Sequence, residues 1–161
     1  MITDKINARN TNREGQTVID FTDGKYVSIE ENAFTDLYPN NANQVEVLIL
    51  ANNRLTNIPN LSNLAHLHTL DLNSNQINRI NSNYLPNSLR ILSLHYNPIN
   101  EISDLSHLNG LIYLMINHNT CIRDNNHIPE NAQIYLYNRE EWGSTPRLLT
   151  NIEQHQSEHC R

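Results

Sequence analysis

The chain has 161 residues and a formal net charge of −6, from 17 acidic and 11 basic side chains. This acidic balance argues against a nucleic-acid partner, whose phosphates need clustered lysines and arginines, and against a polybasic membrane-surface site. No stretch approaches the roughly 18 consecutive apolar residues of a membrane span, and Met1 to Lys5 open no signal-peptide core, so we expect no membrane insertion.

Asparagine is the most unusual feature of the composition, with 28 of the 161 residues. It favours turns and tolerates left-handed backbone, so the chain should turn often and regularly. Leucine, isoleucine, valine and phenylalanine together number 43, which is enough for a core. The two cysteines make no disulfide framework in a chain of this length, so the sequence implies no disulfide staple. Eight histidines would bring the charge to +2 if all were protonated, which leaves acid sensitivity open.

The predicted elements begin after a polar segment. We expect residues 1–15 to be partly disordered and residues 16–26 to form the first strand and turn. Ile19 and Phe21 occupy the inward positions of this strand. From Ile19 to the corresponding Leu48 is 29 residues, so the first unit is longer than those that follow. Its further apolar positions are Tyr26, Ile29, Phe34 and Leu37.

A repeat fills the middle of the chain. Four segments follow the pattern L-x-x-L-x-L-x-x-N-x-L, with valine, isoleucine or cysteine at some leucine positions. They are 22 residues apart without an insertion. Their central leucines are Leu48, Leu70, Leu92 and Leu114. Ile134 and Leu136 indicate a last strand, in which Arg139 replaces the asparagine.

This pattern resembles the leucine-rich repeat family over about residues 16 to 138, and is close to its 22-residue class, found in phosphatase-regulatory subunits and bacterial internalin-like proteins. The resemblance implies an α/β solenoid, a right-handed horseshoe with a parallel concave sheet. The physics agrees, because Leu-x-Leu alternation predicts short strands with one face inward, and stacked units bury a continuous core. We therefore divide the chain into an N-terminal cap at residues 1–26, repeats at 27–138 and a C-terminal capping segment at 139–161.

The asparagine of each repeat has a predicted structural role. Its side-chain amide offers two donors and one acceptor, which can satisfy backbone groups where the chain turns off the sheet. The predicted asparagine ladder consists of Asn53, Asn75, Asn97 and Asn119.

The end of the chain predicts a capping helix at residues 146–157, lying over the last repeat. Ser144 and Thr145 supply a helix cap and Pro146 a first-turn proline. We expect Trp142 to pack there as well. The apolar residues at helical spacing are Leu148, Leu149 and Ile152.

The strand residues between the inward leucines form the predicted concave face. Apolar and aromatic side chains gather on it at the C-terminal end, and such a patch with few charges is typical of interface cores. Strand propensity alone would also favour these residue types. The candidate partner-binding residues are Val47, Ile49, Asp71, Ile91, His95, Tyr96, Tyr113, Met115, His118, Tyr135 and Tyr137.

Catalysis and metal binding are alternatives that the sequence disfavours. Asp71, Ser93 and His95 have the residue types of a hydrolase triad. Residues two apart on one strand are about 6–7 Å apart, too far for a Ser93–His95 hydrogen bond in most rotamers. His95 with His118 could hold a metal, but exposed histidine pairs are usually plain surface residues. A second metal alternative is His155, His159 and Cys160, where the i, i+4 spacing puts both imidazoles on one helix face.

Two other features have structural explanations. Cys121 stands at a leucine-equivalent position, so we expect a small buried hydrophobic residue and no nucleophile. Residues 60–62, Asn-Leu-Ser, match a glycosylation sequon, but nothing in the sequence indicates passage through a glycosylating compartment.

Together these observations predict a monomeric, non-catalytic module that binds a protein partner through its concave face, without cofactor or metal. One hypothesis is an effector of a host-associated microbe that acts on a host protein. The alternative is a cytosolic regulatory or scaffold subunit, such as that of a phosphatase. We accordingly expect a location in the cytoplasm, or in a host cell after export by a non-classical system.

Overall fold

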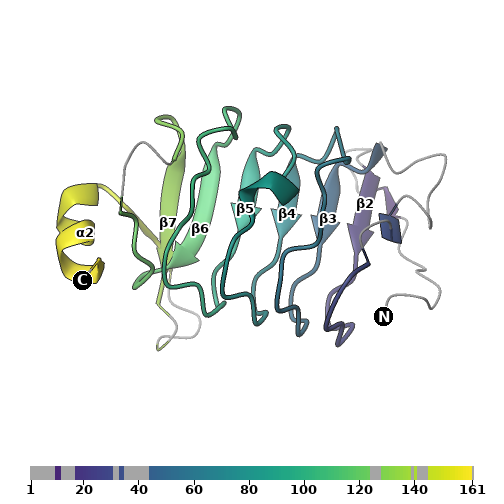
Figure 1. Ribbon diagram of the computed structural model, residues 1–161, viewed down its shortest axis with the longest axis horizontal. Helices are drawn as coiled ribbons and strands as arrows, with labels where there is room; N and C mark the ends of the chain where they lie inside the picture. Colours follow the sequence, from purple (N-terminus) through teal and green to yellow (C-terminus); the bar gives the residue numbers. More distant parts are fainter. Residues whose placement is uncertain are drawn as a thin grey trace.

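The computed structural model describes residues 10–11, 17–30, 33–34, 44–123, 128–138, 140 and 145–160, with side chains from residue 17 onward. Its strands form one sheet whose spatial order is the sequence order (Figure 1). The strands are β1 (Asn10–Thr11), β2 (Thr17–Asp20), β3 (Val47–Ile49), β4 (Thr69–Asp71), β5 (Ile91–Ser93), β6 (Tyr113–Asn117), β7 (Gln133–Tyr137) and β8 (Arg147–Leu148).

The predicted solenoid is confirmed by the strand register. Strands β2 to β7 are parallel, and the central leucines of the 22-residue units are paired in line across the sheet. Leu48, Leu70, Leu92 and Leu114 have no exposed surface. The longer first unit and the last strand also join in register, because Ile19 pairs with Leu48 and Leu114 pairs with Ile134.

Each strand is followed by the same turn in the first three 22-residue units. Asn52, Ser74 and Tyr96 all have a positive φ, between 54° and 57°, directly before a buried asparagine. The left-handed residue turns the chain off the sheet, and asparagine is among the residues that tolerate this conformation best. The described return segments include the short 3₁₀-helix η2 (Ser82–Tyr84) and helical residues at Ala33 and Phe34, and are otherwise largely irregular.

The buried asparagines hold neighbouring turns together. The Nδ2 of Asn97 donates to the carbonyls of Leu72 at 2.8 Å and Leu94 at 3.1 Å, and its Oδ1 accepts from the amide of Ile77 at 3.0 Å. Asn53 and Asn75 make the corresponding bonds in their units. The bonds from each asparagine to the preceding unit join residues that are 20 or more positions apart in sequence, so the asparagine ladder runs along the stack.

The fourth member of the predicted ladder is wrong. Asn119 is exposed. Thr120 is buried and its hydroxyl donates to the Ile99 carbonyl at 3.1 Å, and Asn117 is a second buried residue that reaches the preceding unit. Its Nδ2 donates to the Asn97 carbonyl and its Oδ1 accepts from the Tyr96 amide, both at 2.6 Å. The reason is that β6 stays paired with β7 through Asn117, so its turn begins later than in the other units.

The C-terminal helix exists but starts later than predicted. Residues 147 and 148 form β8, which pairs antiparallel with β7, and α2 spans Ile152–His159. Asn151 caps the helix by accepting a hydrogen bond from the Gln154 amide at 2.9 Å. Arg147 and Leu148 pair with the edge of β7 and form hydrogen bonds with its free backbone groups. The helix therefore begins only after these two residues. Trp142 and Ser144 lie outside the described residues.

A disulfide joins Cys121 to Cys160, so the expectation of no staple is wrong. Cys121 is buried as predicted, but its sulfur is bonded to the residue that follows α2. Backbone hydrogen bonds from Cys121 to Asn100 and from Ile102 to Cys121 fix it to the preceding unit. The disulfide therefore ties α2 to the last turns of the stack, at the end opposite β1 and β2 (Figure 1).

The N-terminal end is closed by a second antiparallel strand. Residues 10 and 11 pair with β2, inside the segment for which we expected partial disorder. The other residues of 1–15 lie outside the described residues, as does Leu37. Phe21 and Phe34 are buried, with ring centroids 6.3 Å apart. In the part of the chain that is described, no helix is long and apolar enough to cross a membrane.

Candidate functional site

The register lines up the outward side chains of the concave face in three rows. The first row is Val18, Val47, Thr69, Ile91, Tyr113 and Gln133. The second row is Asp20, Ile49, Asp71, Ser93, Met115 and Tyr135. The third row lies two positions after the second in each unit, and holds His95, Asn117 and Tyr137 at its C-terminal end. The face is therefore polar and aliphatic toward β2, and aromatic toward β7.

An aromatic cluster forms at the C-terminal end of this face. The His95 imidazole stacks on the Tyr137 ring, with centroids 3.9 Å apart and planes 13° from parallel. Tyr96 meets His95 edge-on at 4.8 Å, and the Tyr113 and Tyr135 rings are 6.0 Å apart. We define the aromatic cluster as His95, Tyr96, Tyr113, Met115, Tyr135 and Tyr137. Its side chains are all half-buried or exposed, so the cluster as a whole has surface that a partner could contact.

Other predicted residues of the face lie beside this cluster or away from it. Ile91 pairs with Tyr113 across β5 and β6 and so borders the cluster. Val47 and Ile49 lie on β3, with β4 and β5 between them and Tyr113. The His118 ring lies 6.0 Å from that of His159 on α2, and its backbone amide donates to the Tyr137 carbonyl at the edge of the cluster.

Ser93 and His95 are closer than strand spacing suggests. The Ser93 Oγ lies 3.0 Å from the His95 Nδ1, so the expectation that they would not hydrogen-bond is wrong. The residues stay two positions apart, but the chain leaves β5 at Ser93 and turns both side chains toward one another. Ser93 is only 5 % exposed, which hides its hydroxyl from a substrate. The pair therefore works as a structural contact beneath the aromatic cluster.

Charge and burial act in opposite directions on His95. Burial lowers its pKa, and Asp71 opposes this by its negative charge. The net lowering from the ordinary value of 6.5 keeps the imidazole neutral at pH 7. Burial also raises the pKa of Tyr137, helped by Tyr96, Asp71 and Tyr135. The stacked pair at the centre of the cluster is therefore uncharged near neutral pH.

Three histidines gather where α2 meets the last turns. His155 is 2 % exposed, and its Nε2 donates to the Thr120 carbonyl at 2.8 Å. The His159 ring lies 4.6 Å from that of His155 and 6.0 Å from that of His118. Among the described residues no group of three or more His, Cys, Asp or Glu side chains is placed to hold a metal ion. Cys160 is bonded to Cys121, so it offers no free thiolate.

This histidine group predicts that the C-terminal cap loosens in acid. Burial lowers the pKa of His159, and so do His155, His118 and Arg147, whereas Glu158 opposes them. A lowered pKa in the folded state means that the unfolded chain binds protons more tightly. Stability is thus complete above the unfolded value of 6.5 and falls as the pH drops toward the lower folded pKa. His95 acts in the same direction.

We expect amide exchange in α2 to rise between pH 7 and pH 5, after correction for the intrinsic pH dependence of exchange. In His159→Gln this rise should be smaller, whereas His66→Gln, at an exposed position in a distant turn, should behave as the parent does. An equal rise in His159→Gln and the parent would contradict the prediction.

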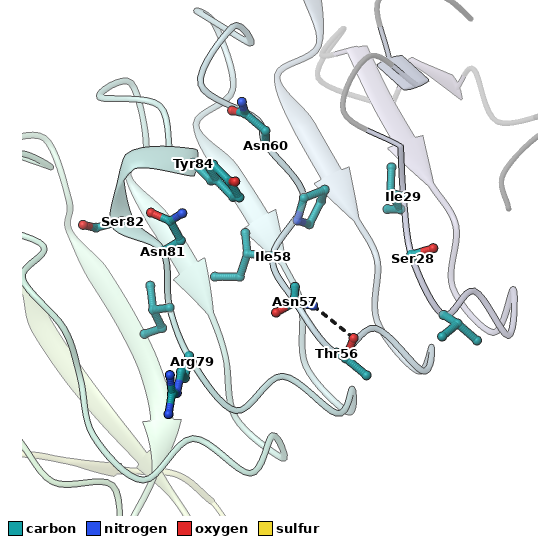
Figure 2. A pocket seen from close by; sticks show the side chains of 13 residues that line it. Ser28, Ile29, Thr56, Asn57, Ile58, Asn60, Arg79, Asn81, Ser82 and Tyr84 are labelled. Carbon is teal, nitrogen blue, oxygen red and sulfur yellow. Dashed lines mark hydrogen bonds between the residues drawn. The ribbon is translucent and has the colours of Figure 1, made fainter.

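A groove on the opposite side of the stack was missed by sequence reasoning. Figure 2 shows this groove, which has a volume of about 660 Å³ and lies on the return segments of the first units. Its apolar lining comes from Val27, Ile29, Ile58, Pro59, Ile80 and Tyr84. Arg79 and several asparagines add polar groups, among them Asn60 of the sequon, whose Oδ1 accepts from the Ser62 hydroxyl at 2.7 Å. The apolar residues between one strand and the next were the only sequence signal for it.

Comparison with known proteins supports the repeat assignment. Residues 43–85 match the family model for leucine-rich repeats in two copies, a segment that contains β3 and β4. The strands β5 and β6 continue the same register beyond the matched segment. No curated protein matches the chain significantly.

Proposed function

We propose, for a chain that carries leucine-rich repeats at residues 43–85, that its concave face binds a protein partner and that the chain performs no chemistry of its own. Leucine-rich repeats generally mediate protein–protein interaction, and a solenoid of this kind is typically a non-enzymatic scaffold. The observation that carries the proposal is the aromatic cluster on an open sheet face. Tyrosine and methionine are enriched in interface cores, where they supply contact area at a small entropic cost.

The anchors of this proposed interface are Tyr113, Met115 and Tyr135. Tyr113 is 36 % exposed, so its ring is offered to a partner and is not buried in the core. Tyr137 and His95 support them from the adjacent row as a rigid stacked pair. Because the rings are held by the sheet and by each other, they lose little conformational freedom on binding, which favours affinity.

The disulfide helps to decide between an exported effector and a cytosolic regulatory or scaffold subunit. Disulfides persist in oxidising compartments and are rare in the cytosol of most organisms. The Cys121–Cys160 bond therefore supports an exported protein over a cytosolic regulatory or scaffold subunit. We infer that the partner is met in an oxidising compartment, which for an effector of a host-associated microbe disfavours the expected location in the cytosol of a host cell.

A triple variant tests the proposed interface. Tyr113→Ala, Met115→Ala and Tyr135→Ala together should reduce capture of the protein's partner from candidate lysates by at least about tenfold, because a tenfold loss needs about 1.4 kcal/mol and a single hot-spot residue contributes about 2 kcal/mol or more. Capture is measured by quantitative mass spectrometry on immobilised parent and variant, after thermal unfolding has shown that the variant folds.

The matched control is Val27→Ala with Tyr84→Ala, which removes exposed apolar surface from the groove on the opposite side. This control should capture the same partner as the parent. Retained capture by the folded triple variant would rule out the concave-face proposal. Loss of capture in the control alone would move the interface to the groove.

A further inference from the structure

The concave face is acidic where it is charged at all. Strands β2 to β7 contain two acidic residues, Asp20 and Asp71, and no lysine or arginine. Both aspartates belong to the second row, with Ile49 between them. Neighbouring strands are about 4.8 Å apart, so the two carboxylates lie on the order of 10 Å from one another.

Both carboxylates are held in a fixed orientation by the residues that follow them. The Oδ1 of Asp71 accepts from the backbone amide of Asn73 at 3.0 Å and from its Nδ2 at 2.7 Å. Asp20 accepts in the same way from the amide and hydroxyl of Thr22. Each aspartate uses one oxygen for these contacts, so its second oxygen stays available on a preorganised group.

Asp71 also lies within electrostatic reach of the aromatic cluster. Asp71 pairs with Ser93 across β4 and β5, two residues before His95, and its charge acts on both His95 and Tyr137, the stacked pair in the next row. Tyrosine presents an electron-rich face, and such a face attracts a cation that approaches within about 6 Å. Since neither ring carries a charge near neutral pH, nothing in the pair repels an incoming cation.

We propose that the concave face recognises an arginine side chain of its protein partner, placed between the Asp71 carboxylate and the aromatic cluster. This inference rests on the proposed function and names the chemistry of the partner. Arginine fits better than lysine, because its planar guanidinium stacks on aromatic rings while it donates to a carboxylate. The overall charge of −6 favours the same partner by steering a basic surface toward the face.

The test uses a minimal probe, N-acetyl-arginine amide, and its uncharged counterpart N-acetyl-citrulline amide. Both are titrated into the full oxidised chain while amide shifts are followed by NMR. The arginine probe should shift signals of Asp71, His95 and Tyr137 in a saturable way. The citrulline probe should bind at least about fivefold more weakly, because it keeps the shape but lacks the charge.

Two variants sharpen this experiment. Asp71→Asn should weaken the arginine probe by at least about fivefold, since the isosteric amide keeps an acceptor but loses the charge. Asp104→Asn is the matched control, because Asp104 holds the Ser106 amide in the same kind of turn away from β2 to β7. That control removes the same charge from the chain and should leave the affinity within about twofold.

Equal binding of the citrulline and arginine probes by the parent would overturn the inference without need of any variant. Shifts confined to residues outside the concave face would do so as well. If the arginine probe fails while the triple variant still abolishes partner capture, the concave-face interface stands and only its arginine chemistry is wrong. If the probe binds and the triple variant keeps its partner, the arginine site exists apart from the main interface.

Discussion

Replacing Cys121 and Cys160 with alanine should lower the free energy of unfolding by about 4 kcal/mol. The disulfide closes a loop with a sequence separation of 39 residues, and its loss returns that loop's freedom to the unfolded chain. Alanine keeps the buried Cys121 position apolar, so the change isolates the cross-link from polarity. Urea unfolding of oxidised parent and double variant, monitored by circular dichroism, measures the difference.

The same experiment has a local readout. α2 rests on the last turns through the His155 contact with Thr120 and through Ile152, which packs partly buried against the core. These few contacts make α2 prone to local unfolding when the disulfide is absent. We therefore expect amide exchange in α2 to rise more in the double variant than exchange in β3 to β5.

Reduction provides the control for the cysteine variant. Dithiothreitol should destabilise the parent by nearly the same amount and leave the alanine variant unchanged. A variant that unfolds at the same urea concentration as the oxidised parent would contradict the assigned role of the disulfide. A destabilisation of the reduced parent alone would point to a defect caused by the free thiols.

Asn97→Ala should destabilise the protein by about 3 kcal/mol. Asn97 has no exposed surface, and its side chain pairs with the Leu72 and Leu94 carbonyls and the Ile77 amide. Alanine removes all of these partners at once and leaves buried polar groups that water cannot reach. The loss should appear as a lower urea midpoint with an unchanged slope.

Asn119→Ala is the matched control for the asparagine ladder. It is the same chemical change at the position that the repeat pattern equates with Asn97, but Asn119 is exposed. Its cost should stay within about 0.5 kcal/mol, as for other surface substitutions. Asn117→Ala should behave like Asn97→Ala, because Asn117 holds the Tyr96 amide and the Asn97 carbonyl. Equal costs at Asn97 and Asn119 would contradict the shifted turn.

The misplaced ladder residue shows where the repeat pattern stops being informative. Asn119 fits the 22-residue spacing, yet the turn after β6 lies elsewhere because β7 follows 20 residues later and extends the pairing to Asn117. Pairing between strands is a contact at long sequence separation, so the local pattern carries no record of it. The helix boundary failed for a related reason, since Arg147 and Leu148 joined the edge of β7.

The candidate site was likewise predicted only in part from the sequence. Row membership followed from alternation alone, so Tyr113, Met115 and Tyr135 were expected on one face, and the register aligns them there. The stacking of His95 on Tyr137 and the Ser93–His95 hydrogen bond depend on side-chain rotamers and on where β5 ends. Neither can be read from strand spacing, which gives only the distance between backbone positions.

By itself the sequence determined the solenoid, because a strict 22-residue period of inward leucines can bury its core only by stacking like units in parallel. The tertiary structure alone decided how the stack ends. Cys121 and Cys160 are 39 positions apart, and only the docking of α2 on the last turns brings their Cα atoms to 4.9 Å. A repeat specifies contacts with its neighbours at a fixed spacing, whereas a cap has no spacing to repeat and is specified by packing.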